Sequence, residues 1–409
     1  MTDCGSASGE YVLYGAPVSL YTGKARSYLR KQRAIAWVER LPSDARYQQH
    51  ILPRIKRNII PVLETPDGTI VQDTTDIIDH LEGARLATLS AYPNTPRQTA
   101  FALIMEAFAE ESLLRQAMHY RWSFAAANGE FLSDQFAALY GLQSDESRAL
   151  GRAGMTDGMA RMARTLGPLG VTDRTIPELE DVLRKLLEAL QAHFLRLPYL
   201  LGWRPTLADY GLLAPFHAHL CRDPHPGLLV KQQAPQVFRW VERMNAPDLD
   251  IPEFHGAPAG ELLPDDEIPQ TLEPVLDLMV RYYLPEIEAV AAATDAWLDA
   301  HEPARGAPVH PKPHIHALGE IEFSYGSVSM RCAMRPFMLY KRQRLTDFLA
   351  GLASGEREAV LHFLAAHGLE PLSTIIARRR VDRLDNLEVW GPAAVPTCDD
   401  DPEQRDLAG

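Results

Sequence analysis

Residues Asn58–Glu82, with the sequence NIIPVLETPDGTIVQDTTDIIDHLE, decide the fold. Their two apolar runs, IIPVLE and TIVQ, have the composition of short strands. The turn TPDGT between them carries proline and Asp-Gly where a tight hairpin favours them. A helical pattern follows from Thr74 to Leu86, and Asp73 and Thr74 are residue types favoured at a helix N-terminus. The stretch therefore predicts a β-hairpin followed at once by a helix.

Pro61 interrupts the first of these two strands near its start. Proline has no backbone N–H, so it loses no ladder hydrogen bond at a sheet edge or in a tight turn. An X-Pro bond is also the kind of peptide bond in which the cis form costs little free energy. Ile60–Pro61 is therefore either an ordinary edge-strand proline or a cis peptide bond beside a functional loop.

The residues before this stretch alternate between strand and helix patterns. Residues 10–15 (EYVLYG) and 34–39 (AIAWVE) have strand composition, and helices are predicted at Lys24–Gln32 and around Asp44–Ile55. Alternating strands and helices that end in a hairpin are typical of a small α/β layer, which we predict for residues 10–86.

A linker with two prolines, AYPNTPRQ at residues 91–98, ends this small layer. Thr95 and Pro96 are residue types typical of the N-cap and the first position of a helix. Helical periodicity then continues to about Met244, and strand-like runs are absent. Residues 96–245 are therefore predicted to form an all-helical domain.

Residues 247–395 form a third predicted region, which starts with a connector rich in proline and aspartate. A helix is predicted from Thr271 to Ala300, with a kink at Pro285, because proline removes a helical hydrogen bond and clashes with the preceding turn. Residues 320–335 (EIEFSYGSVSMRCAMR) alternate apolar and polar side chains around Gly326, as a β-hairpin does.

Two more helices, Lys341–Leu352 and Glu356–His367, complete the predicted α+β extension, and Gly368 is a typical helix stop. The last residues, 396–409, are acidic and polar, which is the composition of a disordered tail.

Composition and charge narrow the function classes. The chain has 409 residues, 46% of them hydrophobic and 23% charged, and a formal net charge of -13. This charge gives no general electrostatic reason to bind nucleic acid or an anionic membrane. The longest basic run, Arg378–Arg380, is followed by Asp382 and Asp385, and we interpret it as a solvated helix face.

No apolar run reaches the length that spans a membrane, and the first ten residues lack the pattern of a secretory leader. The cysteines stand apart from one another without metal or disulfide spacing, which favours a reducing compartment; they are Cys4, Cys221, Cys332 and Cys398. We therefore expect a cytoplasmic protein.

Three histidines, His310, His314 and His316, raise the question of a metal site, because imidazole is a good ligand of zinc and nickel. No cysteine lies near them, prolines break the helical geometry around them, and a carboxylate ligand would have to come from Glu320 or Glu322 in the hairpin. We expect no metal.

Taken in order, these features resemble the glutathione S-transferases. Residues 13–29 (LYGAPVSLYTGKARSYL) resemble the first strand, catalytic loop and first helix of that family, and residues 58–82 resemble its glutathione-binding half. Residues 198–220 (PYLLGWRPTLADYGLLAPFHAHL) resemble its helical domain, including a capping box formed by Thr206 and Asp209. The resemblance implies a thioredoxin-like α/β domain followed by an all-α transferase domain, with the α+β extension beyond the family's usual end.

The resemblance also implies a glutathione site. In that family the proline that corresponds to Pro61 is cis, and the backbone of the preceding residue, here Ile60, binds the cysteinyl part of glutathione. Asp73 and Thr74 match the residues that hold its γ-glutamyl group. The free N–H groups and partial positive charge of a helix N-terminus suit the γ-glutamyl carboxylate, and the Asp73 carboxylate can accept from the ammonium.

Three hydroxyl groups are candidates to activate the glutathione thiol. Ser19 matches the position of the family's catalytic Ser or Cys, Tyr14 matches that of its tyrosine-type members, and Tyr21 lies close in the sequence. Lowering a thiol pKa from about 8.5 to near 7 takes roughly 2 kcal/mol, and one hydrogen bond to a charged group supplies roughly 1.5 to 3 kcal/mol. Ser19 ranks first, although Leu20 replaces the residue that stiffens this loop in serine-type members.

The predicted function is that of a glutathione-dependent transferase that attacks a hydrophobic electrophile by conjugation, ether or halide displacement, or isomerisation. Arg115 and His119, one helical turn apart, are candidates to line the electrophile site between the domains. The resemblance implies a homodimer. We expect the extension to pack over the helical domain, shape this cleft or cover a subunit surface. The alternative is a non-catalytic scaffold or binding protein that acts through the extension.

Overall fold

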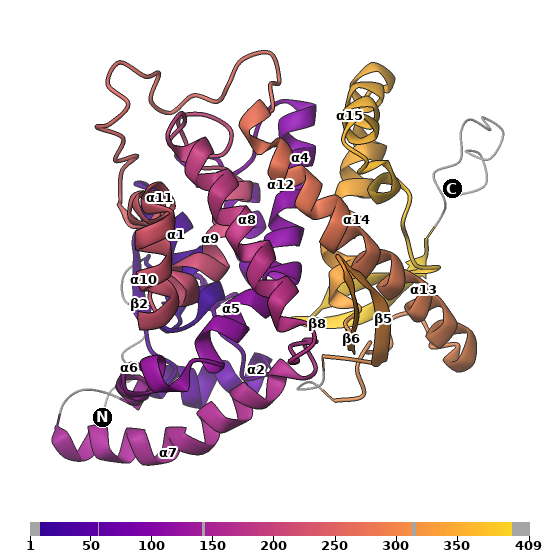
Figure 1. The fold of residues 1–409 in the computed structure, drawn as a ribbon. Helices are drawn as coiled ribbons and strands as arrows, with labels where there is room; N and C mark the ends of the chain where they lie inside the picture. The colour runs from indigo at the N-terminus through magenta and orange to yellow at the C-terminus, as the bar shows by residue number, and fades with distance from the viewer. Residues whose placement is uncertain (1–8, 56, 141–143, 313–315, 395–409) are drawn as a thin grey trace.

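The computed structural model describes residues 9–55, 57–140, 144–312 and 316–394. Three consecutive parts follow one another along the chain: an N-terminal part from β1 to α3, a helical part from α4 to α11, and an extension from α12 to β8. In Figure 1 the orange and yellow extension lies against one side of the indigo and magenta parts.

The N-terminal part contains the four strands β1 (Tyr11–Tyr14), β2 (Trp37–Arg40), β3 (Val62–Glu64) and β4 (Ile70–Gln72), and the helices α1 (Leu20–Lys31), α2 (Leu52–Ile55) and α3 (Thr74–Gly83). The strands form one sheet in the order β2-β1-β3-β4. β1 is parallel to β2 and antiparallel to β3, and β3 pairs with β4 through the predicted hairpin. The predicted thioredoxin-like α/β layer is confirmed.

The alternation of side chains along β1 and β3 decides which helices cover each face of the sheet. Leu13 and Leu63 belong to the core shared with α1 and α3. Their neighbours Val12, Tyr14 and Val62 face the other way and pack with the helical segment that ends in α2. Successive side chains of a strand point to opposite faces, so both faces of this sheet are covered.

The helical part consists of α4 (Pro96–Ala107), α5 (Leu114–Trp122), α6 (Ala125–Ala137), α7 (Asp145–Ala163), α8 (Ile176–Phe194), α9 (Leu207–Pro215), α10 (Pro224–Gln233) and α11 (Pro235–Asn245). The predicted capping box is present at the start of α9, where the Asp209 carboxylate accepts from the Thr206 N–H at 2.9 Å. α4 passes into α5 through a π-helical turn, Phe108–Ser112.

The extension consists of α12 (Glu273–Leu278), α13 (Leu284–His301), β5 (Gly319–Tyr325), β6 (Val328–Met334), α14 (Phe337–Gly351), α15 (Ser354–Ala366), β7 (Arg379–Leu384) and β8 (Leu387–Ala393). The predicted hairpin around Gly326 is confirmed as β5 and β6. A π-helical turn, Met279–Tyr283, divides the predicted helix into α12 and α13, and Pro285 lies in the first turn of α13. The kink at Pro285 stays a prediction.

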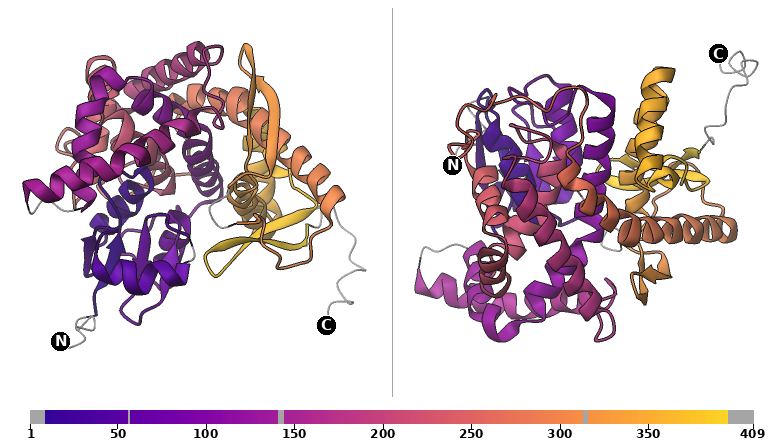
Figure 2. Two further views of the ribbon diagram at one scale, coloured as in Figure 1. Left: turned by 90° about the horizontal axis from the view of Figure 1, so that it is seen from below. Right: turned by 45° about the horizontal axis from the view of Figure 1, so that its top comes forward.

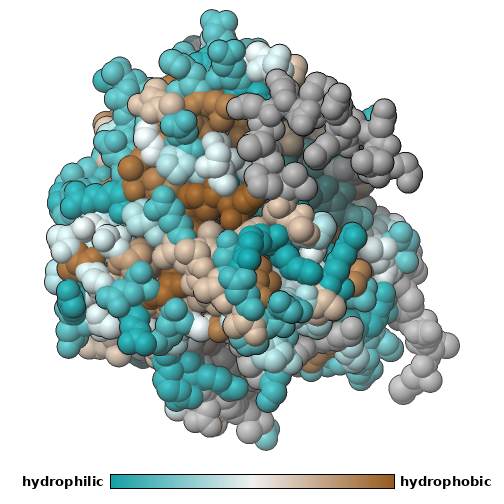
Figure 3. All heavy atoms as spheres, turned by 90° about the vertical axis from the view of Figure 1, so that its right-hand side faces the viewer, coloured by the Kyte–Doolittle hydropathy of each residue, from teal (hydrophilic) through white to brown (hydrophobic). Residues whose placement is uncertain are grey.

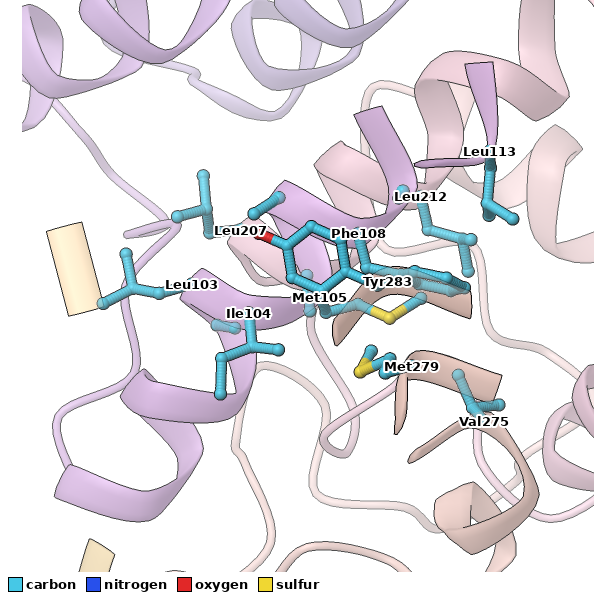
Figure 4. Close-up of a cluster of buried hydrophobic side chains, with 14 of the residues drawn as sticks. Leu103, Ile104, Met105, Phe108, Leu113, Leu207, Leu212, Val275, Met279 and Tyr283 are labelled. Atoms are coloured by element: carbon cyan, nitrogen blue, oxygen red, sulfur yellow. The ribbon is translucent and has the colours of Figure 1, made fainter. Parts of the chain in front are cut away.

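One hydrophobic core joins the extension to the rest of the molecule. Figure 4 shows Val275, Met279 and Tyr283 of the extension packed with Met105 and Phe108 of the helical part. The same buried cluster continues to Leu13 in β1 and Trp390 in β8. The extension is therefore packed into the fold rather than attached to its surface.

A second hairpin, β7–β8, was not predicted, and the interpretation of Arg378–Arg380 as a helix face was wrong. Arg379 and Arg380 start β7, with Arg378 just before it, and the strands turn at Asp385 and Asn386, which have φ values of 50° and 64°. Asn and Asp tolerate this left-handed conformation, and a two-residue turn of this kind joins antiparallel strands. The left view of Figure 2 shows the yellow hairpin reaching toward the N-terminal part.

The extension side of the molecule is largely hydrophilic, with apolar patches between the polar residues (Figure 3). Within the described part of the chain, no helix is both long and apolar enough to cross a bilayer. The predicted tail at residues 396–409, together with His314, Cys4 and Cys398, lies outside the described residues.

Candidate functional site

A cavity of about 600 Å³ opens where the N-terminal part, the helical part and the extension meet. Its volume lies within the range of about 300 to 1,000 Å³ that is typical of small-molecule sites. A second hollow, of about 680 Å³, is lined by residues such as Arg54 of α2 and Asp67 and Asp385 of two turns, none of which was predicted to be a site residue. All four predicted glutathione-binding residues, Ile60, Pro61, Asp73 and Thr74, line the first cavity, which is therefore the candidate site.

The N-terminal end of α3 forms one wall of this cavity. Asp73 is the N-cap residue, and its carboxylate accepts from the Thr75 N–H at 2.9 Å. Both Asp73 and Thr74 line the cavity. The Thr74 hydroxyl is buried and has no hydrogen-bond partner among the described residues. A buried hydroxyl left unpaired costs roughly 1 to 3 kcal/mol, so a ligand that bonds to it would gain affinity.

The loop before β3 forms the adjacent wall. The Ile60–Pro61 peptide bond is cis, as the resemblance implied, and both residues line the cavity. The Gln72 side-chain amide donates to the backbone carbonyls of Arg57 at 3.1 Å and Ile59 at 2.7 Å. These two bonds fix the loop relative to the end of β4, so the Ile60 backbone and the start of α3 keep one relative position.

Of the three hydroxyl candidates, Tyr21 lines this cavity, whereas Ser19, at the start of α1 two residues before it, and Tyr14 are not among the lining residues. Burial raises the pKa of Tyr21 well above its usual value, and the carboxylate of Glu111 adds to the rise, so this phenol stays protonated and can donate. Ser19 is the N-cap residue of α1, and its oxygen accepts from the Thr22 N–H at 3.2 Å. That contact uses an oxygen lone pair and leaves the hydroxyl proton of Ser19 free to donate.

The hydroxyl of Tyr14 is hydrogen-bonded outside the cavity. Its side chain is fully buried on the face of the sheet that packs against α2, and its hydroxyl donates to the Glu64 carboxylate at 3.0 Å. Burial raises its pKa, and the hydrogen bond to Glu64 adds to the rise. The Glu64 carboxylate also accepts a hydrogen bond from Arg46, so Tyr14, Glu64 and Arg46 form one hydrogen-bonded group. Tyr14 is not among the cavity-lining residues.

Arg115 and His119 lie outside the cavity lining. The Arg115 guanidinium forms a buried two-bond pair with Glu286 on α13, with one bond of 2.9 Å. The His119 ring contacts Ser123 and the Glu180 carboxylate, at 2.9 and 3.1 Å, and burial lowers its pKa.

The helical wall of the cavity comes instead from Glu111, Leu114 and Met118. Their spacing of three and four residues places them on one helical face. Each step of one residue turns a helix by about 100°, so residues 115 and 119 point away from that face.

The extension supplies the remaining wall. From the segment around β6 it contributes Ala333, Arg335 and Phe337, and from the second hairpin it contributes Arg383 and Glu388. Arg383 donates from Nε to the Asp76 carboxylate at 3.1 Å and from Nη1 to Glu388 at 2.8 Å. The sequence did not indicate these residues, because charged side chains in an unrecognised hairpin resemble a solvated surface.

A buried ion network behind α3 joins all three parts. Lys24 on α1 and Lys341 on α14 both contact Glu106 and Glu110 of the helical part. Burial alone would raise the pKa of Glu106, but Lys24, Lys341 and Arg344 hold it well below its usual range. The Thr75 hydroxyl donates to Glu106 at 2.9 Å, so the network also fixes the first turn of α3.

Among the described residues, no group of three or more His, Cys, Asp or Glu side chains is arranged to hold a metal ion.

Two family models match the chain. The model of the glutathione S-transferase N-terminal domain matches residues 13–86, and the model of the glutathione S-transferase C-terminal domain matches residues 173–243. No curated protein matches it. The two matches lie in the N-terminal part and the helical part, in that order.

Several solved structures are similar to this chain. The β-etherase LigF from Sphingobium sp. strain SYK-6 is 19% identical with a TM-score of 0.41, and the match covers 58% of this chain and 95% of that one. A glutathione S-transferase from Methylobacillus flagellatus KT, with glutathione bound, is 16% identical with a TM-score of 0.33, covering 57% and 93%. The glutathione transferase GSTFuA3 from Phanerochaete chrysosporium is 15% identical with a TM-score of 0.39, covering 58% and 97%.

Proposed function

The chain belongs to the glutathione S-transferase superfamily. We propose that it binds glutathione at the N-terminal end of α3 and joins the glutathione sulfur to the reactive carbon of an apolar electrophile. The observation that carries the proposal is the unpaired, buried Thr74 hydroxyl beside the Asp73 carboxylate in the cavity wall. The γ-glutamyl carboxylate would bond to the Thr74 hydroxyl and the free N–H groups of α3. Its ammonium would bind the Asp73 carboxylate.

The cysteinyl part of glutathione would lie along the Ile60 backbone, which places its sulfur toward the start of α1. There the Ser19 hydroxyl donates a hydrogen bond to the thiolate, and Tyr21 is the second candidate donor. A hydrogen bond to a charged group supplies roughly 1.5 to 3 kcal/mol, which corresponds to a fall of about one to two in the thiol pKa. Tyr14 takes no part, because its hydroxyl is bonded to Glu64.

The second substrate would occupy the rest of the cavity. Leu114 and Met118 of the helical part, Leu169 from the loop before α8 and Phe337 of the extension line that space. Apolar and aromatic walls favour an apolar electrophile, whose burial contributes about 25 cal/mol per Å² of apolar surface. Held beside the thiolate, its reactive carbon is attacked by sulfur.

Steady-state turnover of glutathione with chlorodinitrobenzene tests this proposal. In Ser19→Ala the thiol pKa rises, so kcat/KM should fall about 10- to 100-fold below pH 7 and recover as pH increases. Tyr14→Phe is the matched control, since its hydroxyl lies outside the cavity, and its pH profile should coincide with that of the wild type. An unchanged pH profile in Ser19→Ala would move the role to Tyr21, and a folded wild type without turnover or glutathione binding would end the proposal.

A further inference from the structure

Glu111 is a carboxyl group in the wall of the cavity that the proposed function leaves without a role. It lies in the π-helical turn Phe108–Ser112. Such turns are rare and occur often at functional sites. Its side chain is only 4% exposed, yet it lines the cavity beside Leu114 and Met118. A charged group this deeply buried needs a compensating partner or a bound proton.

One arginine of the extension provides part of that compensation. Arg335 donates from Nη1 to Glu111 Oε2 at 3.0 Å and from Nη2 to the Glu111 backbone carbonyl at 3.1 Å. Glu111 Oε1 accepts no hydrogen bond from any described residue. One carboxyl oxygen is therefore held by the extension, and the other is available to a ligand in the cavity.

Burial and four charged groups, from the same turn and from the extension, shift the pKa of Glu111. Burial raises the pKa of Glu111, and Glu110 in the same turn and Glu286 on α13 add to the rise. Arg335 and Lys341 act in the opposite direction without cancelling it. The carboxyl therefore keeps its proton to a higher pH than an ordinary glutamic acid.

Tyr21 is the other proton-bearing group in this part of the cavity. Its pKa is raised well above that of an ordinary phenol, which makes it a far weaker acid than a carboxyl group. The apolar side chains of Leu114 and Phe337 line the same space, so a proton transfer there competes with little water. Glu111 is the stronger candidate donor.

We propose that Glu111 is a catalytic acid, which acts when the leaving atom of the second substrate is an oxygen, as in an aryl epoxide. This inference rests on the proposed function. The glutathione sulfur forms a C–S bond at the ring carbon, the C–O bond breaks, and the departing oxygen takes the Glu111 proton. The proton lost by the glutathione thiol then restores Glu111, so the net reaction is addition of the thiol across the epoxide.

Two electrophiles separate this role from a structural one. Displacement of chloride from chlorodinitrobenzene needs no proton at the leaving group, whereas opening of styrene oxide does. General acid catalysis contributes roughly 10² to 10⁴ in rate. In Glu111→Gln the ratio of kcat/KM for styrene oxide to that for chlorodinitrobenzene should therefore fall by at least about 30-fold.

Glu178→Gln is the matched control. Glu178 also ties the helical part to the extension, accepting from Tyr282 at 2.7 Å and from Ser327 at 2.5 Å, but it does not line the cavity. In Glu178→Gln the ratio of kcat/KM for styrene oxide to that for chlorodinitrobenzene should match that of the wild type. If Glu111→Gln does not fold, the wild type carries the test, because its styrene oxide turnover should fall at high pH as Glu111 loses its proton while chlorodinitrobenzene turnover does not.

The outcomes are distinct. A ratio that falls only in Glu111→Gln supports the catalytic role. A ratio that is unchanged in Glu111→Gln, or that falls equally in Glu178→Gln, overturns it and leaves the proposed function standing. A folded wild type that turns over neither electrophile and binds no glutathione overturns both.

Discussion

Arg383, on β7 of the extension, donates a hydrogen bond of 2.9 Å to the backbone carbonyl of Gln72, the last residue of β4. From the same hairpin, the Asn386 side chain accepts from the Gln72 N–H at 3.0 Å. Both backbone groups of the residue before Asp73 are therefore held by side chains more than 300 positions later in the chain. The extension fixes the part of the sheet from which the proposed glutathione site is built.

Replacing Arg383 should weaken glutathione binding. Arg383→Ala removes the bonds to Gln72 and Asp76 and leaves Glu388 with Arg57 alone. Because Glu388 keeps Arg57 and Asp76 keeps its bond from Tyr340, the loss of unfolding free energy should be roughly 1 to 3 kcal/mol. We expect this loss of stability and a dissociation constant for glutathione that rises about tenfold, measured by denaturation and by calorimetry.

Arg380→Ala on the same strand is the control for this prediction, because Arg380 pairs at the surface with Asp347 at 2.7 Å. Surface pairs contribute about 0 to 1 kcal/mol. Equal losses of glutathione affinity in the two variants would contradict a specific role for Arg383.

Thr74 and Thr75 are adjacent threonines with opposite expected effects. Thr74→Val removes a hydroxyl without a protein partner, so stability should hold or rise slightly while glutathione affinity falls about five- to tenfold, the equivalent of one hydrogen bond. Thr75→Val removes the donor to Glu106 and should lower the unfolding free energy by about 1 to 3 kcal/mol. Thermal unfolding and glutathione titration of both variants check this, and identical behaviour would contradict the assignment.

Much of the glutathione-binding half could be predicted because its signals are local. The turn before Ile70 and the N-cap at Asp73 each depend on residues a few positions apart, and so does the capping box of Thr206 and Asp209 in the helical part. The electrophile wall could not be predicted in the same way. Helical periodicity identifies the apolar face of a helix but not which part of the structure that face contacts. The observed lining residues, Leu114 and Met118, each precede a predicted candidate by one residue.

The β7–β8 hairpin escaped detection because its alternation is carried by charge rather than by apolar residues. Arg380 and Asp382 lie on one face of β7 and pair with each other, and Arg380 also pairs with Asp347. Val381 is buried on the other face. The local turn signal is Asp385–Asn386, but Asp385 was interpreted only as an acidic neighbour of the basic run.

His193 should make stability fall in acid. Its ring is buried, contacts the Thr271 hydroxyl at 2.7 Å and the Tyr199 carbonyl at 3.1 Å, and burial lowers its pKa from 6.5 to about 4. Because burial disfavours protonation of His193 in the folded state, the contribution of its neutral ring to stability is complete above pH 6.5. This contribution is lost as pH falls toward 4.

The difference between the two pKa values corresponds to about 3 kcal/mol. The stability gap between wild type and His193→Gln should therefore narrow by about 2 to 3 kcal/mol from pH 7.5 to pH 4.5 in urea unfolding. A stability gap between wild type and His193→Gln that is constant with pH would contradict this.

Asp209→Ala should destabilise the fold without changing the chemistry. The Asp209 carboxylate accepts from the backbone N–H groups of Leu200 and Thr206 and from the Trp240 indole, at 3.0, 2.9 and 3.2 Å. Each buried donor left unpaired costs roughly 1 to 3 kcal/mol, so the unfolding free energy should fall by at least about 3 kcal/mol. The glutathione KM of the remaining folded protein should be unchanged, and a melting temperature equal to that of wild type would contradict the prediction.

The central claim is that glutathione binds at the start of α3, and calorimetric titration of glutathione into wild type and Asp73→Asn tests it most directly. Asparagine keeps the N-cap and tolerates the φ of 89° at this position, so the variant loses only the charge. The account predicts one glutathione per wild-type chain, with roughly micromolar to low-millimolar affinity that falls at least about tenfold in Asp73→Asn. No binding to folded wild type, or equal binding by both proteins, would contradict it.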